Sequence, residues 1–300
     1  MTWTRVARFL TIAMTAMPLT AFAQTHDHDR WGVPSGAIVK EFDAFISGFD
    51  DDDDDDGDGV GDRWGVPEWV AYEIQRTGET CVKTHERPGW TGDPTLQARG
   101  LMPTDDTYAS GTAFRKRHPA WFSRGHLAPK VHAERISKKA AEDTHSFYNA
   151  VPQRQPMNAG VWLRLEDLTA AWAQRHRRIW VISGPIFADR HPVATLGDQG
   201  ELPVAIPEAL YKLVIRESAD PKVPEVLAFV VPQVGAGVDK GPFRPERFLT
   251  TVDEVERLTG LDFLSALSKA SQKAVEATEA EAIWPTRSED FVRACSGEAE

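Results

Sequence analysis

Four short apolar segments constrain the fold of this 300-residue chain more than any other feature of its sequence. They are rich in β-branched and aromatic residues, which is typical of strands in a sheet. These segments cover residues 69–74, 179–183, 210–215 and 226–231. Apolar residues at helical spacing are found at 138–144, 159–174, 252–258 and 264–282. Because strands and helices do not alternate strictly, the sequence predicts an α+β fold rather than a doubly wound sheet.

The N-terminal residues predict export. Arg5 and Arg8 give a positively charged start, residues 9–19 are mostly apolar, and residues 21–23 read Ala-Phe-Ala, as at a signal cleavage site. The apolar stretch is shorter than the ~20 residues that a membrane-spanning helix needs. We therefore expect a signal peptide at residues 1–23 and a secreted or periplasmic protein that is not held in a membrane. The alternative is an uncleaved N-terminal anchor.

A polar and acidic segment, residues 24–65, follows. Eight aspartates between residues 50 and 58 dominate the net charge of -11, and without them the charge would be -3. The acidic balance therefore does not exclude a nucleic-acid-binding cleft elsewhere. Residues 54–65 have the spacing of a calcium-binding loop, with Gly59 at the sharp turn. The expected ligands are Asp54, Asp56, Asp58, the carbonyl of Val60, and Asp62.

Two features of this part of the sequence leave alternatives open. Gly65 stands where an EF-hand loop has its closing Glu, so a flexible acidic linker is the other reading of the aspartate run. Cys81 and Cys295 are the only cysteines, and export would place them where disulfides persist. We expect them to join the C-terminal tail, residues 271–300 and largely helical, to the start of a domain spanning residues 66–270.

The window from residue 122 to 167 carries the groups that phosphodiester hydrolysis requires. His126 has a side chain suited to take a proton from water near neutral pH, so it is the candidate general base. Arg124, two residues earlier, offers a guanidinium to a phosphate. Asn149 and Gln153 lie in a short strand and turn, where they would either support the site or satisfy the backbone.

A helix is expected to open near Asn158, which is followed eight residues later by Glu166. Eight residues span just over two helical turns, so the two side chains should project from neighbouring parts of one face. An amide oxygen and an outer carboxylate are sensible anchors for a hydrated Mg²⁺, which prefers oxygen ligands and keeps several waters.

At these residues the chain resembles the DNA/RNA non-specific endonucleases, the endonuclease G-like ββα-metal or His-Me finger nucleases. The matching motifs are Arg124-Gly125-His126, then Asn149 with Gln153, then Asn158 with Glu166. The resemblance implies a ββα-metal fold in which a mostly antiparallel central sheet is flanked by helices. It also implies that His126 activates water, Asn158 alone binds Mg²⁺ directly, Glu166 acts through water, and Arg124 contacts the phosphate. Mn²⁺ would substitute for Mg²⁺, and cleaved DNA and RNA would carry 5′-phosphate ends.

Two positions depart from the family pattern. Ser123 stands where many members have Asp, and Ala170 stands where some have Arg, so we expect Arg164 or Arg175 to supply a second cation. His132 and His145 match no motif and are expected to be structural or at the surface. Two other functions stay open: a calcium-dependent interaction protein on an inactive nuclease fold, and a phosphodiesterase of small phosphoesters. The sequence predicts no particular oligomeric state.

Overall fold

The computed structural model describes residues 26–50, 64–77, 84, 87–109, 122–187, 194–220, 222–238 and 240–292. The expected signal peptide at residues 1–23, the calcium loop with its ligands at 54–62, and both cysteines, Cys81 and Cys295, lie outside these residues. They stay predictions.

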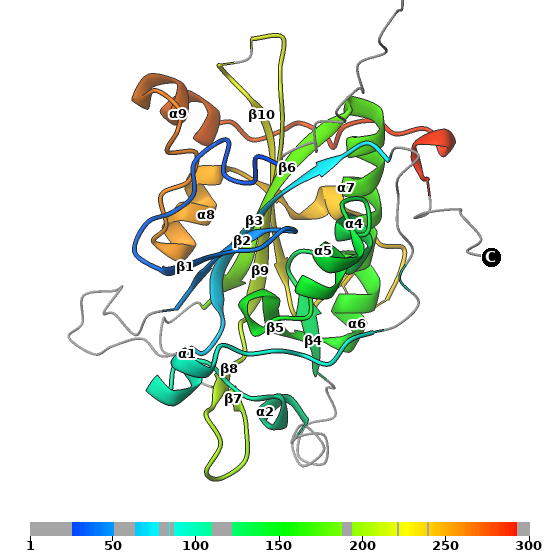
Figure 1. Ribbon diagram of the computed structural model, residues 1–300. Coiled ribbons are helices and arrows are strands. Elements are labelled where there is room, and N and C mark those ends of the chain that lie inside the picture. Colours follow the sequence, from blue (N-terminus) through cyan, green and yellow to red (C-terminus); the bar gives the residue numbers. More distant parts are fainter. Residues whose placement is uncertain are drawn as a thin grey trace, which may run out of the picture.

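A seven-stranded antiparallel sheet forms the centre of the molecule (Figure 1), in the order β1-β2-β3-β6-β9-β10-β11. Every neighbouring pair runs antiparallel. The strands are β1 (Ile38–Glu41), β2 (Ile46–Phe49), β3 (Pro67–Gln75), β6 (Arg178–Ile186), β9 (Ala209–Arg216), β10 (Glu225–Pro232) and β11 (Leu249–Thr250). All four segments expected to be strands lie in β3, β6, β9 and β10, so the predicted antiparallel α+β fold is confirmed.

The sheet begins well before residue 66, where the sequence places the start of the domain. Strand β2 pairs with β3, and Phe45 and Phe49 are fully buried against the core. These apolar side chains need a partner surface, and the edge of β3 provides it. Residues 38–49, counted with the acidic segment on composition alone, are therefore an integral part of the sheet.

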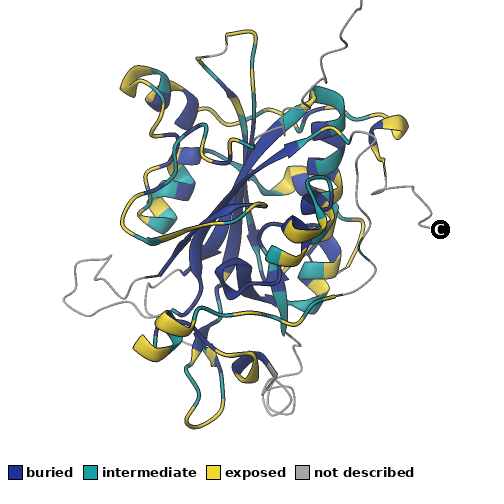
Figure 2. Cartoon of the chain, viewed as in Figure 1, coloured by how far each residue is buried: buried dark blue, intermediate teal, exposed yellow. Residues whose placement is uncertain are grey.

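Helices cover both faces of the sheet, as Figure 1 shows. One face packs against α7 (Leu163–His176), where Trp162, Leu165 and Trp172 are buried. The other face packs against α8 (Val252–Thr259) and α9 (Lys269–Glu276), with Phe263 at the contact. The middle strands are therefore buried on both sides (Figure 2), as in a three-layer core.

The last helix is shorter than the sequence predicts. We expected residues 264–282 to be helical, but α9 covers only Lys269–Glu276. Leu264 has a φ of 52°, which a helix does not allow, and the Ser268 hydroxyl accepts the Ser271 amide to cap the helix start. The other helices are α1 (Pro94–Arg99), α2 (Asp105–Ala109), α4 (Lys130–Ala133), α5 (Lys138–Asp143) and α6 (Gln155–Met157).

Two further short strands lie outside the central sheet. Strands β7 (Thr195–Leu196) and β8 (Val204–Ala205) form a small hairpin beside α1 and α2 in Figure 1.

Across the described ranges, we find no helix with both the length and the apolar character needed to cross a bilayer.

A buried histidine ties the N-terminal segment to the sheet. The Glu73 amide of β3 donates to His28 Nδ1 at 3.0 Å, so His28 carries its proton on Nε2, which donates to the Asp43 carbonyl at 3.2 Å. Burial lowers the pKa of His28 from 6.5 to about 4. Only the neutral ring can accept the Glu73 amide, so protonation breaks this connection.

The first prediction concerns stability in acid. Because the pKa of His28 is lower in the folded chain, the unfolded chain binds its proton first as the pH falls. The stability that His28 contributes is complete above pH 6.5 and decreases towards pH 4, by up to roughly 3 kcal/mol. His28→Gln should lower stability at pH 7 but flatten its pH dependence. Urea unfolding at pH 4.5, 5.5, 6.5 and 7.5 measures this, and parallel curves for the two proteins would contradict it.

Candidate active site

A β-hairpin followed by a broken helix positions the predicted site residues. Strand β4 (Phe122–His126) pairs with β5 (Ala150–Arg154), so that His126 faces Ala150 across the ladder. The chain then enters α6, a π-helical turn at Asn158–Trp162, and α7. Figure 1 shows this hairpin beside α6, on the face of the sheet that α7 covers. Two strands and a helix thus form one compact element.

Three of the predicted residues line one cleft of about 510 Å³: Arg124, His126 and Asn158. The sequence analysis missed six other residues that line it, namely Arg87, Trp90, Asp105, Tyr108, His145 and Gln155. Four of them, Arg87, Trp90, Asp105 and Tyr108, come from the segment before β4, which matches no motif in the sequence. His145, expected to be structural or at the surface, lies at the cleft.

Ring contacts hold His126 at the cleft. Its ring centroid lies 4.9 Å from that of Trp90 and 4.9 Å from that of His145, the latter edge-on at 78°. Its Nε2 atom is buried and has no hydrogen-bond partner among the described residues. Burial, with the positive charges of Arg87 and Lys130 and the neighbouring His145, lowers the pKa of His126 to about 3. The ring is therefore neutral, and so can accept a proton, at ordinary pH.

Arg124 is paired with a carboxylate in the cleft. Its guanidinium lies 2.7 Å from Asp105 Oδ1 and about 6 Å from the ring centroids of Trp90 and Tyr108. Asp105 is the first residue of α2 and is more than half exposed. Ser123, one of the two departures from the family pattern, hydrogen-bonds to the side chain of Gln155. The carboxylate beside Arg124 thus comes from a different part of the chain.

The glycine between Arg124 and His126 makes room for Gln153. Gly125 lies within β4, opposite Val151. A Cβ at Gly125 would lie 2.2 Å from the side chain of Gln153, which is fully buried. Neither amide atom of Gln153 has a hydrogen-bond partner in the described part of the chain. Gln153 therefore packs against Gly125 inside the β4–β5 pair and is not among the residues that line the cleft.

Asn149 satisfies the backbone around the hairpin, one of the two roles the sequence left open. Its Oδ1 accepts the Ala128 amide at 2.7 Å, and its Nδ2 donates to the carbonyls of Ala128 and Thr144, each at 2.9 Å. The side chain is fully buried. These three bonds hold the segment that leaves His126 against the end of α5.

Asn158 and Glu166 do not share one cavity. Gly160, between them, has φ -107° and ψ -109°, so the helix is kinked there. A side chain at Gly160 would collide with Phe243, 2.8 Å from its Cβ. The kink turns Asn158 into the cleft, whereas Glu166 lines a separate pocket with His132 and Arg135. Residues 158–166 therefore do not form the single straight helix that the spacing of Asn158 and Glu166 predicts.

Glu166 lies instead among buried groups that join α7 to the sheet. Lys212 on β9 is fully buried, and its Nζ lies 4.2 Å from the ring centroid of Trp162. Burial raises the pKa of Glu166 and lowers that of Lys212, and attraction between the two charges opposes both shifts. His132 Nε2 also lies 3.2 Å from the Glu166 carbonyl oxygen.

The second cation of the cleft is not one of the two that the sequence suggested. Arg164 lies over the ring of Phe291, at 5.2 Å, and Arg175 pairs with Asp290 at 3.3 Å. Neither lines the cleft, because both point from α7 towards the C-terminal segment. Arg87 lines the cleft instead.

The sequence is similar to those of known nucleases. Residues 61–270 match the model of the DNA/RNA non-specific endonuclease family. The human mitochondrial nuclease EXOG is 30% identical over 215 residues, covering 69% of this chain and 54% of its own length. The chain thus spans about half the length of that relative. The nuclease of Serratia marcescens is 30% identical over 217 residues, covering 69% of this chain and 72% of its own.

A solved structure shares the fold. A chain in the crystal structure of the EndoG/EndoGI complex superposes with a TM-score of 0.60 at 20% identity, over 81% of this chain and 92% of that one. Together with the β4–β5–α7 element, this confirms the predicted ββα-metal nuclease fold.

The second prediction separates a structural asparagine from a functional one. Asn149→Ala leaves three buried backbone groups without partners and should lower the free energy of unfolding by about 3 kcal/mol. Asn158→Ala removes a half-buried side chain at the cleft and should cost less than about 1 kcal/mol. Denaturant unfolding of both variants tests this, and equal losses would contradict the assignment.

Proposed function

The chain belongs to the DNA/RNA non-specific endonuclease family, and on that basis we propose that it is a metal-dependent endonuclease that hydrolyses DNA and RNA. The observation that carries the proposal is the meeting of a neutral histidine, an arginine and an asparagine in one cleft. His126 is the general base, Arg124 holds the phosphate and Asn158 holds the metal. The proposed products carry 5′-phosphate ends.

The cleft suits a hydrated Mg²⁺, with Mn²⁺ as a substitute. Asn158 offers one neutral amide oxygen, and among the described lining residues only Asp105 is acidic. An ion held by so few protein oxygens must keep several waters, as Mg²⁺ does. A volume of about 510 Å³ leaves space for those waters and a phosphate. When bound, the ion would supply stabilisation of the negative charge on the leaving oxygen.

The protein's own groups account for the remaining steps. The neutral ring of His126, which lines the cleft, takes the proton of the attacking water. Arg124 exchanges its ion pair with Asp105 for one with the scissile phosphate. Arg87 adds a second positive charge to the same cleft.

Low sequence selectivity follows from these contacts. Phosphate contacts position a nucleic acid without reading its bases, and the two cations among the described lining residues, Arg87 and Arg124, are suited to phosphate. Trp90, which is half-buried at the cleft, offers an aromatic ring that any base can contact. We therefore assign DNA and RNA alike as substrates.

Glu166 is assigned a positioning role. The family resemblance implies action through water at the metal, but Glu166 lies in the neighbouring pocket, beside the buried Lys212. We assign it to anchoring α7, whose preceding turn carries Asn158. Export through residues 1–23, to a secreted or periplasmic location, completes the proposal.

The third prediction concerns the base and the metal ligand. His126→Ala and Asn158→Ala should each lower the rate of plasmid cleavage in Mg²⁺ by at least about 100-fold. EDTA should abolish cleavage by the wild type. His176→Ala, a histidine at the far end of α7, is the matched control and should keep full activity.

Two outcomes would contradict this assignment. A fully active His126→Ala variant would exclude His126 as the base. A wild type that cleaves nothing with Mg²⁺ or Mn²⁺ would favour the interaction protein on an inactive nuclease fold.

The fourth prediction concerns pH. Since the pKa of His126 is lowered to about 3, the base stays unprotonated well below pH 6.5. In the free enzyme, kcat/KM should therefore be level from pH 8 down to about pH 5. Initial rates on a short labelled duplex, with circular dichroism as a control for folding, measure this. A fall in kcat/KM centred near pH 6.5 would show that His126 titrates normally.

A further inference from the structure

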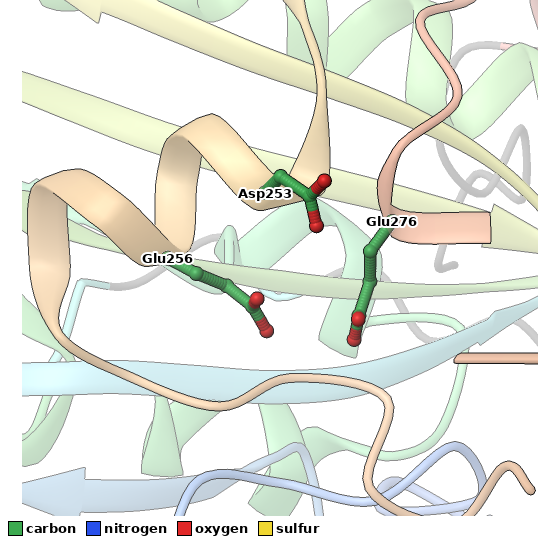
Figure 3. A group of neighbouring side chains, drawn as sticks. All are labelled: Asp253, Glu256 and Glu276. Atoms are coloured by element: carbon green, nitrogen blue, oxygen red, sulfur yellow. The ribbon is translucent and has the colours of Figure 1, made fainter. Parts of the chain in front are cut away.

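Three carboxylates meet on the face of the molecule opposite the cleft. Asp253 and Glu256 extend from α8, and Glu276 is the last residue of α9. One oxygen from each lies within 4.8 Å of the others. Figure 3 shows the three side chains pointing towards a common space between the two helices.

Glu276 is the member that needs explanation. It is only 6% exposed, and its Oε1 atom is buried without a hydrogen-bond partner among the described residues. It also ends a helix, where the backbone dipole disfavours a negative charge. A buried carboxylate oxygen without a partner is costly, so this position calls for a positive charge.

The neighbouring side chains supply little positive charge: Gln272 hydrogen-bonds to the Glu276 side chain, and the attraction of Lys269 is opposed by the charges of Asp262 and Asp253. Glu256 accepts the Phe263 amide at 2.8 Å. Lys269 lies 3.6 Å from Asp262 but is 82% exposed. Burial, with the charges of Glu276, Asp262 and Asp253, raises the pKa of Glu256 to about 7. Burial raises the pKa of Glu276 as well.

We propose that Asp253, Glu256 and Glu276 bind a calcium ion that joins α8 to α9. Carboxylate oxygens are the ligands of hard cations, and no His or Cys belongs to the group. Calcium–oxygen distances of about 2.4 Å allow two ligands to lie up to about 4.8 Å apart, which covers the observed separations. Asp253 is exposed, so water can complete the coordination. Mg²⁺ demands shorter bonds and stricter octahedral geometry.

The site is structural in this proposal. It lies on the opposite face of the sheet from His126, and it connects the last helix to the one before it. A site with three carboxylates and open positions should bind with a Kd on the order of 10 µM to 1 mM. Binding to the folded chain alone should raise its Tm.

The test isolates this site from the two others that the chain could offer. The parent protein is the full chain carrying Asn158→Ala, Asp56→Asn and Asp58→Asn, which disables the proposed catalytic metal and the expected acidic loop. Isothermal titration with CaCl₂ should find one bound ion, and calcium should raise the Tm by a few degrees. Adding Glu276→Gln should abolish both effects, whereas Glu279→Gln, an exposed neighbour, should leave both unchanged.

Stability without calcium supplies a second readout. Glu276→Gln removes an unpaired buried charge, so in EDTA the variant should unfold at a higher temperature than its parent. A parent that binds no calcium would overturn the proposal. So would a Glu276→Gln variant that binds it equally well, or one that is less stable than its parent in EDTA.

Discussion

The structure depends on burying both faces of one antiparallel sheet. Strands β3, β6 and β9 have almost no exposed side chains, so each face requires its own layer of helix. This requirement places α7 and the β4–β5 hairpin on one side and α8 with α9 on the other. The cleft is thereby built on a support that cannot shift without exposing the core. It also separates the two sides chemically, with cations around His126 and carboxylates around Glu276.

Polar groups buried within this apolar frame hold the site in place. Asn149 ties the segment after His126 to α5, and Gln153 fills the space that Gly125 leaves. Lys212 reaches from the sheet to the ring of Trp162, next to the turn that carries Asn158. Each of these contacts fixes the backbone beside a cleft residue, so the reactive side chains need few hydrogen bonds of their own.

The sequence predicts those parts of the molecule that depend on local pattern. The four central strands are visible as apolar runs. Arg124 and His126 are found because their motif is short and contiguous, and Asn158 because Glu166 follows it at the spacing of a second motif. Arg87 and His145 reach the cleft through the folding of separate segments, and nothing in their own surroundings marks them. The kink at Gly160 is equally hidden, because Phe243, which packs closely against this glycine, is 83 residues further along the chain. Residues 38–49 were not predicted to be strands because β1 and β2 are only four residues long and give no long apolar run in the sequence.

The ion pair between Arg124 and Asp105 gives the cleft a resident competitor for anions. Asp105 is tethered, so its effective concentration at the guanidinium is the same whatever the dilution of the protein. Any phosphate must displace it, which weakens capture of free anions such as inorganic phosphate. In the proposed reaction, the same carboxylate would return to the guanidinium after cleavage and compete with the new end of the strand. The ion pair would thereby favour release of the product over its tight retention.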